Sequence, residues 1–136
     1  MGNVYAELTL KNAGDVIFFK RGLTQEPEIR QMTVTAMVDT GAWTLVINEA
    51  VRDKLGLEEG EDDWVTLANG VIETVKKASP IEVHWKNRSM ICRPIVLSGN
   101  EEVLLGAIPM EDMDLIVDPR GETVIGKHGD RIIKRL

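Results

Sequence analysis

The stretch VDTGAW, residues 38–43, places an acid, a small hydroxyl residue and a glycine directly after an apolar run. Asp-Thr-Gly makes a reasonable turn at the end of a strand, because Asp bonds its own backbone and Gly adopts angles that other residues avoid. A carboxylate fixed in such a turn could also act as a general base that takes a proton from water. Taken alone, a three-residue match is weak, and it favours a simple turn around Asp39.

The segments around this triplet read mostly as short strands, because apolar and β-branched residues recur in runs bounded by turn residues. One hairpin is expected to join strands 4–10 and 16–20 through a turn at 11–15. A second is expected over 64–75, where Asn69-Gly70 favours the positive φ angles of a type I′ turn. The remaining strands are expected at 28–38, 43–47, 81–85, 89–97, 102–106, 114–119 and 122–126.

Two segments break the strand period and predict short helices at 48–57 and 109–114. Asn48 is expected to cap the first helix, and Gly56 is expected to follow its end. Pro109 is expected at the first helical position of the second. The spacing of so many short strands, with only two helical segments, predicts a barrel or a sandwich.

These motifs, taken in order, resemble the retropepsin-type (clan AA) aspartic proteases over roughly residues 28–119. A strand leads into 38–42, an apolar-Asp-Thr-Gly-Ala motif. A short helix ending in Leu-Gly-Leu at 55–57 follows, and then the hairpin 64–75, at the place of the family's flap. The segment 103–106, Val-Leu-Leu-Gly, matches the second signature of the family, and a short helix comes after it. This ordered set is much more specific than the triplet.

The resemblance implies an all-β fold, a closed acid-protease β-barrel with one or two short helices, built from a single domain over 1–136. The chain holds one Asp-Thr-Gly and is half the length of a pepsin-like enzyme. It is therefore expected to form a homodimer with one Asp39 from each subunit. The implied function is an aspartic endopeptidase that hydrolyses extended peptides between apolar residues through an Asp-activated water.

The resemblance also implies roles for the neighbours of Asp39. Thr40 is expected to reach across the dimer axis, Gly41 to donate its amide to the carboxyl group, and Gly106 to lie beneath the loop. The residues expected to contact the substrate are Ala42, Trp43, Ala68, Asn69 and Gly70. Trp43 stands where viral enzymes carry a polar residue, and it cannot accept a hydrogen bond from substrate.

Two other interpretations stay open. The chain could be a catalytically inactive module that keeps the protease fold for peptide binding or dimerisation, because an intact motif does not prove turnover. It could also be a small β-barrel of unrelated function, in which Asp39 is an exposed turn residue far from any second copy.

Composition limits the other classes of function. The net charge of −6 and the pI of about 4.9 argue against a general nucleic-acid binder, which needs a basic face. The lone cysteine, Cys92, permits no intramolecular disulfide and fits a reducing, cytoplasmic setting. The N-terminus lacks a signal-peptide pattern and no apolar run could cross a bilayer, so no membrane partner is expected.

Several other residues are expected to have structural roles. Cys92 is expected to be a small buried residue. His84 and His128 lack the spacing of metal ligands, and the acidic run 57–63 predicts a solvated loop, so neither a metal nor a cofactor is expected. Tryptophans 43, 64 and 85 are expected in the core or in an interface. Aspartates 112, 114 and 118 are expected at helix ends or turns.

Overall fold

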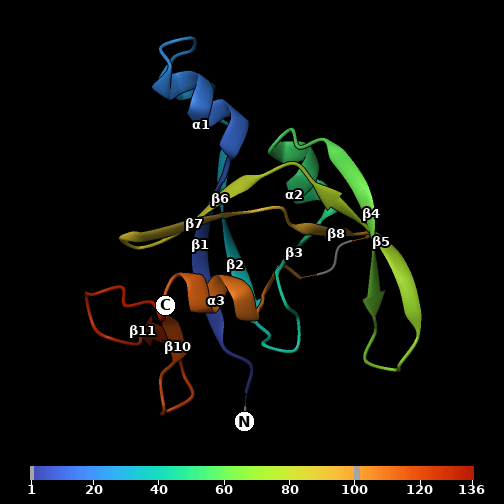
Figure 1. The fold of residues 1–136 in the computed structure, drawn as a ribbon, viewed down its shortest axis with the longest axis vertical. Helices are drawn as coiled ribbons and strands as arrows, with labels where there is room; N and C mark the ends of the chain where they lie inside the picture. The colour runs from blue at the N-terminus through green and yellow to red at the C-terminus, as the bar shows by residue number, and fades with distance from the viewer. Residues whose placement is uncertain (1, 100–101) are drawn as a thin grey trace.

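A computed structural model describes residues 2–99 and 102–136, and the fold is mostly β (Figure 1). The strands are β1 (Tyr5–Asn12), β2 (Gln31–Val38), β3 (Leu45–Asn48), β4 (Glu59–Thr66), β5 (Ile72–Ala78), β6 (Ile81–Trp85), β7 (Arg88–Cys92), β8 (Ile95–Leu97), β9 (Leu104–Leu105), β10 (Leu115–Val117) and β11 (Val124–Gly126). The helices are α1 (Ala13–Lys20), α2 (Glu49–Lys54) and α3 (Ala107–Asp112), with a 3₁₀ turn, η1, at Glu26–Glu28. Among the described residues, no helix is both long and apolar enough to cross a membrane.

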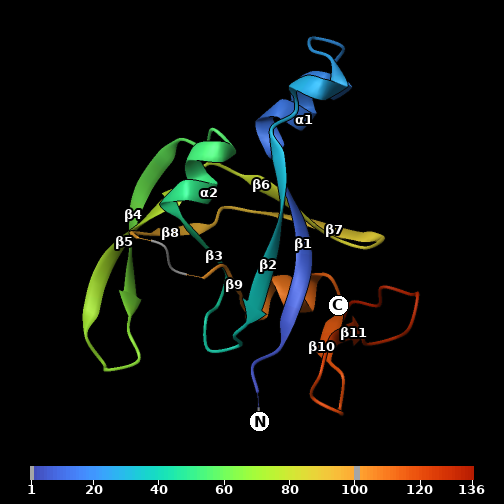
Figure 2. The same cartoon turned by 180° about the vertical axis from the view of Figure 1, so that it is seen from behind.

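Nine strands form one curled sheet in the order β4-β5-β8-β3-β9-β2-β1-β6-β7, and β10 pairs with β11 in a separate ladder. Figure 2 shows the same sheet from behind, with β1 and β2 running most of the length of the molecule. No ladder joins the outer strands β4 and β7 within the described part of the chain. The curled sheet agrees with the expected β architecture, while its closure into a barrel stays a prediction.

The apolar core follows from strand alternation. Ala6, Leu8 and Leu10 of β1 are buried at every second position, and Ile81 and Val83 of β6 repeat the pattern. Side chains on successive strand residues point to opposite faces, so each of these strands lines the core with one face. The predicted helix after β3 is confirmed as α2, with the Asn48 side chain accepting from the Val51 amide and Gly56 at a φ of +63°.

The strand predicted at 16–20 is wrong, because these residues lie in α1 and the 11–15 segment is no hairpin turn. The end of β1 from Thr9 onward, where a hairpin would begin, is already paired with β2 on one side and with β6 on the other, so it has no free edge for a third strand. The Asn12 side chain instead accepts from the Asp15 amide and starts a helix. The molecule therefore has three short α-helices in its described residues, where one or two were expected.

The hairpin predicted over 64–75 is confirmed as the β4–β5 hairpin, but its type I′ turn is not. Gly70 has a φ of +83°, whereas the φ of Asn69 is not positive, and a type I′ turn needs a positive φ at both residues. The Gly70 amide bonds the Leu67 carbonyl at 2.9 Å, and the Leu67 amide bonds the Val71 carbonyl at 2.8 Å. These bonds describe a three-residue loop that ends in a left-handed glycine, the next commonest hairpin connection.

Three other boundaries differ from the predictions. Most of the acidic run 57–63 belongs to strand β4, where Asp62 and Asp63 pair with lysines of β5, so it is not a loop. The strand expected over 89–97 is divided into β7 and β8, because Pro94 has no amide hydrogen to continue a ladder. Helix α3 begins two residues before Pro109, which therefore does not occupy the first helical position.

Candidate active site

Asp39 follows β2 directly and is half-buried. Its amide donates to the Leu105 carbonyl at 3.0 Å, which continues the pairing of β2 with β9 beyond the strand. Its carboxylate oxygen Oδ1 accepts the Gly41 amide at 3.0 Å, the bond expected from the sequence. The loop thus holds one carboxylate oxygen, and within residues 2–99 and 102–136 no hydrogen bond is formed by Asp39 Oδ2. An ordinary Asp turn would form the same contact with the Gly41 amide.

Gly106 lies against the loop that carries Asp39. Strand β9 sits between β2 and β3, so the connection 39–44 must cross the end of β9. The amides of Ala107 and Ile108 donate to the carbonyls of Ala42 and Trp43, at 2.8 and 2.9 Å. A Cβ at Gly106 would stand 2.3 Å from the Thr44 carbonyl oxygen and 2.5 Å from that of Ala42. Only a glycine fits, because both obstacles are backbone atoms.

The other loop residues divide between exposed and buried positions. Thr40 is exposed, Ala42 is half-buried and 43% of Trp43 is exposed, whereas Thr44 is buried. Trp43 is therefore not a core residue of the single subunit. Behind the loop, Cys92 is half-buried, and burial raises the pKa of its thiol to about 11, despite hydrogen bonding to Thr44. A thiol in this state is not a nucleophile at neutral pH.

The β4–β5 hairpin and the Asp39 loop lie at the same end of the molecule in both views (Figures 1 and 2). The tip residues Ala68, Asn69 and Gly70 are all exposed. Closer to the sheet, a second apolar cluster is formed by Val46, Val75 and Ile95, with Ala42, Val65, Leu97 and Leu104 packed against it. This cluster joins the inner side of the hairpin to the Asp39 loop.

The outer face of the same hairpin is different. Trp64 is 75% exposed and Ile72 is 62% exposed, so Trp64 is not a core anchor within this chain. Trp85, in contrast, is 8% exposed, and this part of the tryptophan prediction is confirmed for the core. Lys86 lies over the Trp85 ring at 4.7 Å from its centroid.

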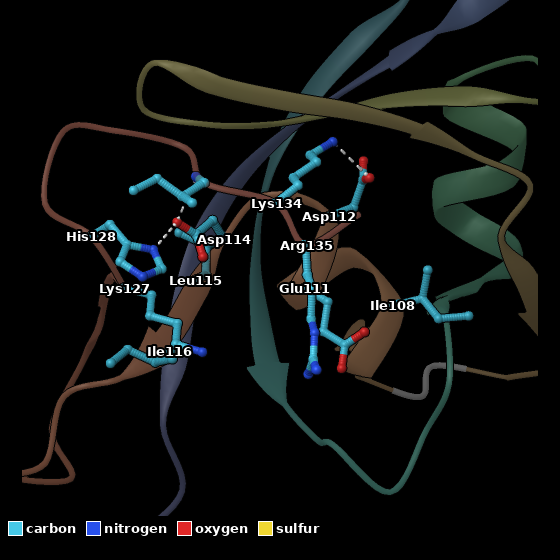
Figure 3. A pocket seen from close by; sticks show the side chains of 11 residues that line it. Ile108, Glu111, Asp112, Asp114, Leu115, Ile116, Lys127, His128, Lys134 and Arg135 are labelled. Carbon is cyan, nitrogen blue, oxygen red and sulfur yellow. Dashed lines mark hydrogen bonds and ion pairs between the residues drawn. The ribbon is translucent and has the colours of Figure 1, made fainter.

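A hollow of about 880 Å³ lies between α3, β10 and the C-terminal segment. Figure 3 shows the His128 imidazole turned toward the Asp114 carboxylate and Lys134 turned toward Asp112. The first pair is 2.6 Å apart and the second 2.9 Å. None of the residues predicted to bind substrate lines this hollow, although its lining residue Ile108 bonds the Trp43 carbonyl of the Asp39 loop through its amide.

Asp114 and Arg88 are both buried in this region, and the sequence did not predict their burial. Asp114 is buried just beyond α3, and its carboxylate accepts from His128 Nδ1 and from the Ile133 amide at 3.0 Å. The hydrogen bond from His128 lowers the pKa of Asp114, and the bond from the Ile133 amide adds to this effect. Arg88 is 2% exposed and donates to the carbonyls of Met113, Asp114 and Gly129. The position of Arg88 beside a turn did not indicate in the sequence that its side chain would be buried.

No group of three or more His, Cys, Asp or Glu side chains is placed to hold a metal ion in residues 2–99 and 102–136. His84 contacts Glu82 at 2.8 Å, and His128 contacts Asp114. Each histidine thus has one carboxylate partner.

Comparisons with known proteins agree with the geometry of the loop. The family model described as "gag-polyprotein putative aspartyl protease" matches residues 26–112. The retroviral protease-like domain of Ddi1 from Leishmania major is 14% identical, with 88% of this chain and 84% of that chain covered and a TM-score of 0.55. This likeness indicates a shared fold. No curated protein sequence matches the chain.

Two further solved structures are similar to the chain. A retropepsin-like aspartic protease from Rickettsia conorii is 17% identical, with coverages of 87% and 89% and a TM-score of 0.45. The protease of EIAV, in complex with the inhibitor HBY-793, is 26% identical, with coverages of 59% and 76% and a TM-score of 0.43. Because the family model spans well over half of the residues and contains both Asp39 and Gly106, the chain belongs to the retropepsin-like aspartyl proteases of the gag-polyprotein type.

Proposed function

We propose that the protein is an aspartic endopeptidase whose active site forms when two copies bring their Asp39 side chains together. The observation that carries this proposal is the Asp39 loop itself, which wraps over Gly106 and fixes one carboxylate oxygen through the Gly41 amide. The exposed hairpin at the same end of the molecule supports it. A single chain supplies one such carboxylate, so the reaction requires a two-fold axis beside Asp39.

The proposed reaction divides two roles between the two copies of Asp39. One carboxylate takes a proton from a bound water, while its protonated counterpart donates a hydrogen bond to the carbonyl oxygen of the substrate. At about 3 Å and an effective dielectric constant near 20, two full charges would repel by roughly 5–6 kcal/mol. The pair therefore holds one proton over roughly four pH units.

The remaining predicted residues would act around this pair. Thr40, exposed beside Asp39, would contact the second copy, and Gly106 would keep the loop close to β9. The tip residues Ala68, Asn69 and Gly70 would close over an extended peptide and bond its backbone. Ala42 and the apolar cluster between hairpin and loop favour apolar side chains in the substrate. Trp43, which is 43% exposed, would make apolar contact with the substrate at a position where it cannot accept a hydrogen bond.

The test is cleavage of a peptide library by Asp39→Asn. We expect its cleavage rate to fall by roughly 10²–10⁴-fold or more, because general acid–base catalysis at the water is lost. Its thermal unfolding should stay close to that of the unmodified protein, since Asn can still accept the Gly41 amide. A matched control is Asp53→Asn, which changes an exposed carboxylate on α2 and should leave the rate unchanged.

Two outcomes distinguish the proposal from an inactive module. Cleavage that is blocked by pepstatin and lost in Asp39→Asn supports the enzyme. Peptide binding without cleavage at any pH between 3 and 8, equally strong in Asp39→Asn, would instead support a peptide-binding module that kept the fold.

A further inference from the structure

Residues 17–23, Ile-Phe-Phe-Lys-Arg-Gly-Leu, are exposed without interruption along the second half of α1 and the turn after it. Ile17, Phe18, Phe19 and Leu23 are 46%, 51%, 37% and 68% exposed. Both phenylalanines of the chain lie in this segment. It also lies outside the family match, which begins at residue 26. The aspartyl protease family therefore gives no reason for this apolar surface.

The exposure belongs to an ordered helix. Its start is capped by Asn12, and Asp15 accepts two side-chain bonds from Arg30, both 2.8 Å long, and a third from the Arg30 amide. Its end is closed by the Leu23 amide, which bonds the Phe18 carbonyl at 2.9 Å. The apolar side chains are thus held outward by the fold.

The distribution of these side chains around the helix distinguishes a groove on another protein from the surface of a bilayer as the partner. Successive helix residues are about 100° apart, so Ile17, Phe18 and Phe19 cover about 200° of the circumference. Only Ala13 and Val16 of α1 are buried against the protein. A groove on another protein would cover one side of this segment and leave the other wet. The interface of a bilayer is deformable and can cover this wide apolar arc, while the basic end of the segment stays at the level of the lipid phosphates.

The charges of the segment point to the same partner. Lys20 and Arg21 give residues 17–23 a local charge of +2, with no acid among them, in a chain whose net charge is −6. The nearest acid on the helix, Asp15, is neutralised by Arg30. Apolar residues followed by basic ones match a bilayer interface, where side chains enter the acyl boundary and cations meet lipid phosphates.

We propose that residues 17–23 dock the protein on the surface of a bilayer that contains anionic lipid. In Figures 1 and 2, α1 projects from the end of the molecule opposite the β4–β5 hairpin and the Asp39 loop. Docking through α1 would therefore leave that loop facing away from the lipid and free to meet a second copy. The proposal does not depend on catalysis, and it departs from the expectation of no membrane partner, which came from the lack of a spanning segment.

The test is co-sedimentation of the full chain with vesicles of phosphatidylcholine, with or without phosphatidylserine. We expect binding to the vesicles that contain phosphatidylserine. The double variant Phe18→Ala with Phe19→Ala should reduce the bound fraction at least tenfold. Lys20→Gln with Arg21→Gln should weaken binding by about tenfold and reduce its dependence on salt, because each cation near the surface adds to the attraction. Ile91→Ala, which alters a 61% exposed residue on the edge strand β7, should bind as the unmodified protein does.

Three results would overturn this proposal. The first is no binding to either kind of vesicle at millimolar lipid, and the second is equal binding by the phenylalanine double variant. The third is that the double variant abolishes self-association in sedimentation velocity while lipid binding is absent, which would assign the segment to a contact between copies. Unchanged thermal unfolding of each variant is the check that α1 still folds.

Discussion

Gly106 shows how one residue fixes the position of the proposed catalytic carboxylate. Its missing side chain lets the backbone of residues 42–44 pass close to the end of β9, and the amides that follow it bond the loop carbonyls. Asp39 is bonded to the same strand through the Leu105 carbonyl. The geometry of the acid therefore depends on a residue more than sixty positions away in the chain.

Gly106→Ala should destabilise the fold by roughly 2–4 kcal/mol, because the new Cβ meets backbone atoms that cannot rotate away. Urea unfolding followed by tryptophan fluorescence measures this loss. Gly2→Ala is the matched control, since nothing lies within 4 Å of its added Cβ, and its effect should stay within about 0.5 kcal/mol. An unchanged unfolding midpoint for Gly106→Ala would contradict the close packing of loop and strand.

Asp114 should make the stability of the fold depend on pH. Its pKa is lowered in the folded state, mainly by the His128 hydrogen bond, from the ordinary value of 3.8. A lowered pKa contributes stability above the unfolded-state value, and this contribution is lost as pH falls through the folded-state value. The thermal midpoint should therefore decrease below about pH 4 in the unmodified protein.

Asp114→Asn should lower the midpoint near neutral pH and should show a smaller further decrease in acid, because it has no carboxylate to protonate. Midpoints measured from pH 7 to pH 2 provide the comparison. Asp112→Asn removes only a partly exposed pair with Lys134 and should change the curve little. Parallel curves for the unmodified protein and Asp114→Asn would show that Asp114 has no such role.

The β4–β5 hairpin is part of the sheet, whereas α1 projects from it. The hairpin extends two strands of the sheet, and its inner residues Val65 and Val75 join an apolar cluster with Ala42. Helix α1 leaves the sheet between β1 and β2 and keeps only its first half against the core. Asn12 connects this helix to α2, since its side chain also donates to the Leu55 carbonyl at 2.9 Å.

Asn12→Ala should destabilise the protein by about 2–3 kcal/mol, because it removes a helix cap and leaves the buried Leu55 carbonyl without that donor. Chemical unfolding gives the magnitude, and amide exchange should show faster opening of α1. Asn69→Ala, in the exposed hairpin tip, loses one bond to the Val71 amide and should cost less than about 1 kcal/mol. Equal losses for the two variants would mean that Asn12 does not join the two helices.

At the scale of the molecule, the single chain has the loop, the hairpin and the apolar cluster but only one Asp39. The proposed enzyme is thus active only as a dimer, and its activity depends on the fraction of chains that are paired. The curled sheet leaves the Asp39 loop at one end, where a second copy could approach, and α1 at the other (Figures 1 and 2).

Specific activity should therefore decrease on dilution below the dissociation constant of the pair, and it should vary with protein concentration as the dimer fraction does. Sedimentation equilibrium measures that fraction under the same conditions. The activity should be greatest at acidic pH, where the pair of carboxyl groups holds one proton. A constant specific activity in a strictly monomeric protein would contradict a site shared between subunits.

The local features whose causes lie within a few residues could be predicted from the amino-acid sequence alone. Strand alternation in β1 and β6, the Asn48 cap and Gly56 stop of α2, and the hairpin at Asn69-Gly70 all follow from short-range patterns. The ordered set of the Asp-Thr-Gly-Ala motif, the short helix, the hairpin, the Val-Leu-Leu-Gly segment and the helix after it was sufficient to identify the family. These parts of the fold could be predicted because the residues that cause them are neighbours in the chain.

The features that depend on distant contacts could not be predicted from the sequence and are visible in the folded chain alone. Residues 16–20 are apolar enough for a strand, but both edges of β1 are occupied from Thr9 onward, and a helix forms instead. Likewise, the burial of Arg88 and Asp114 depends on a C-terminal segment that packs back onto α3. The free energy that favours these arrangements comes from partners far along the chain, and a sequence pattern does not contain that pairing.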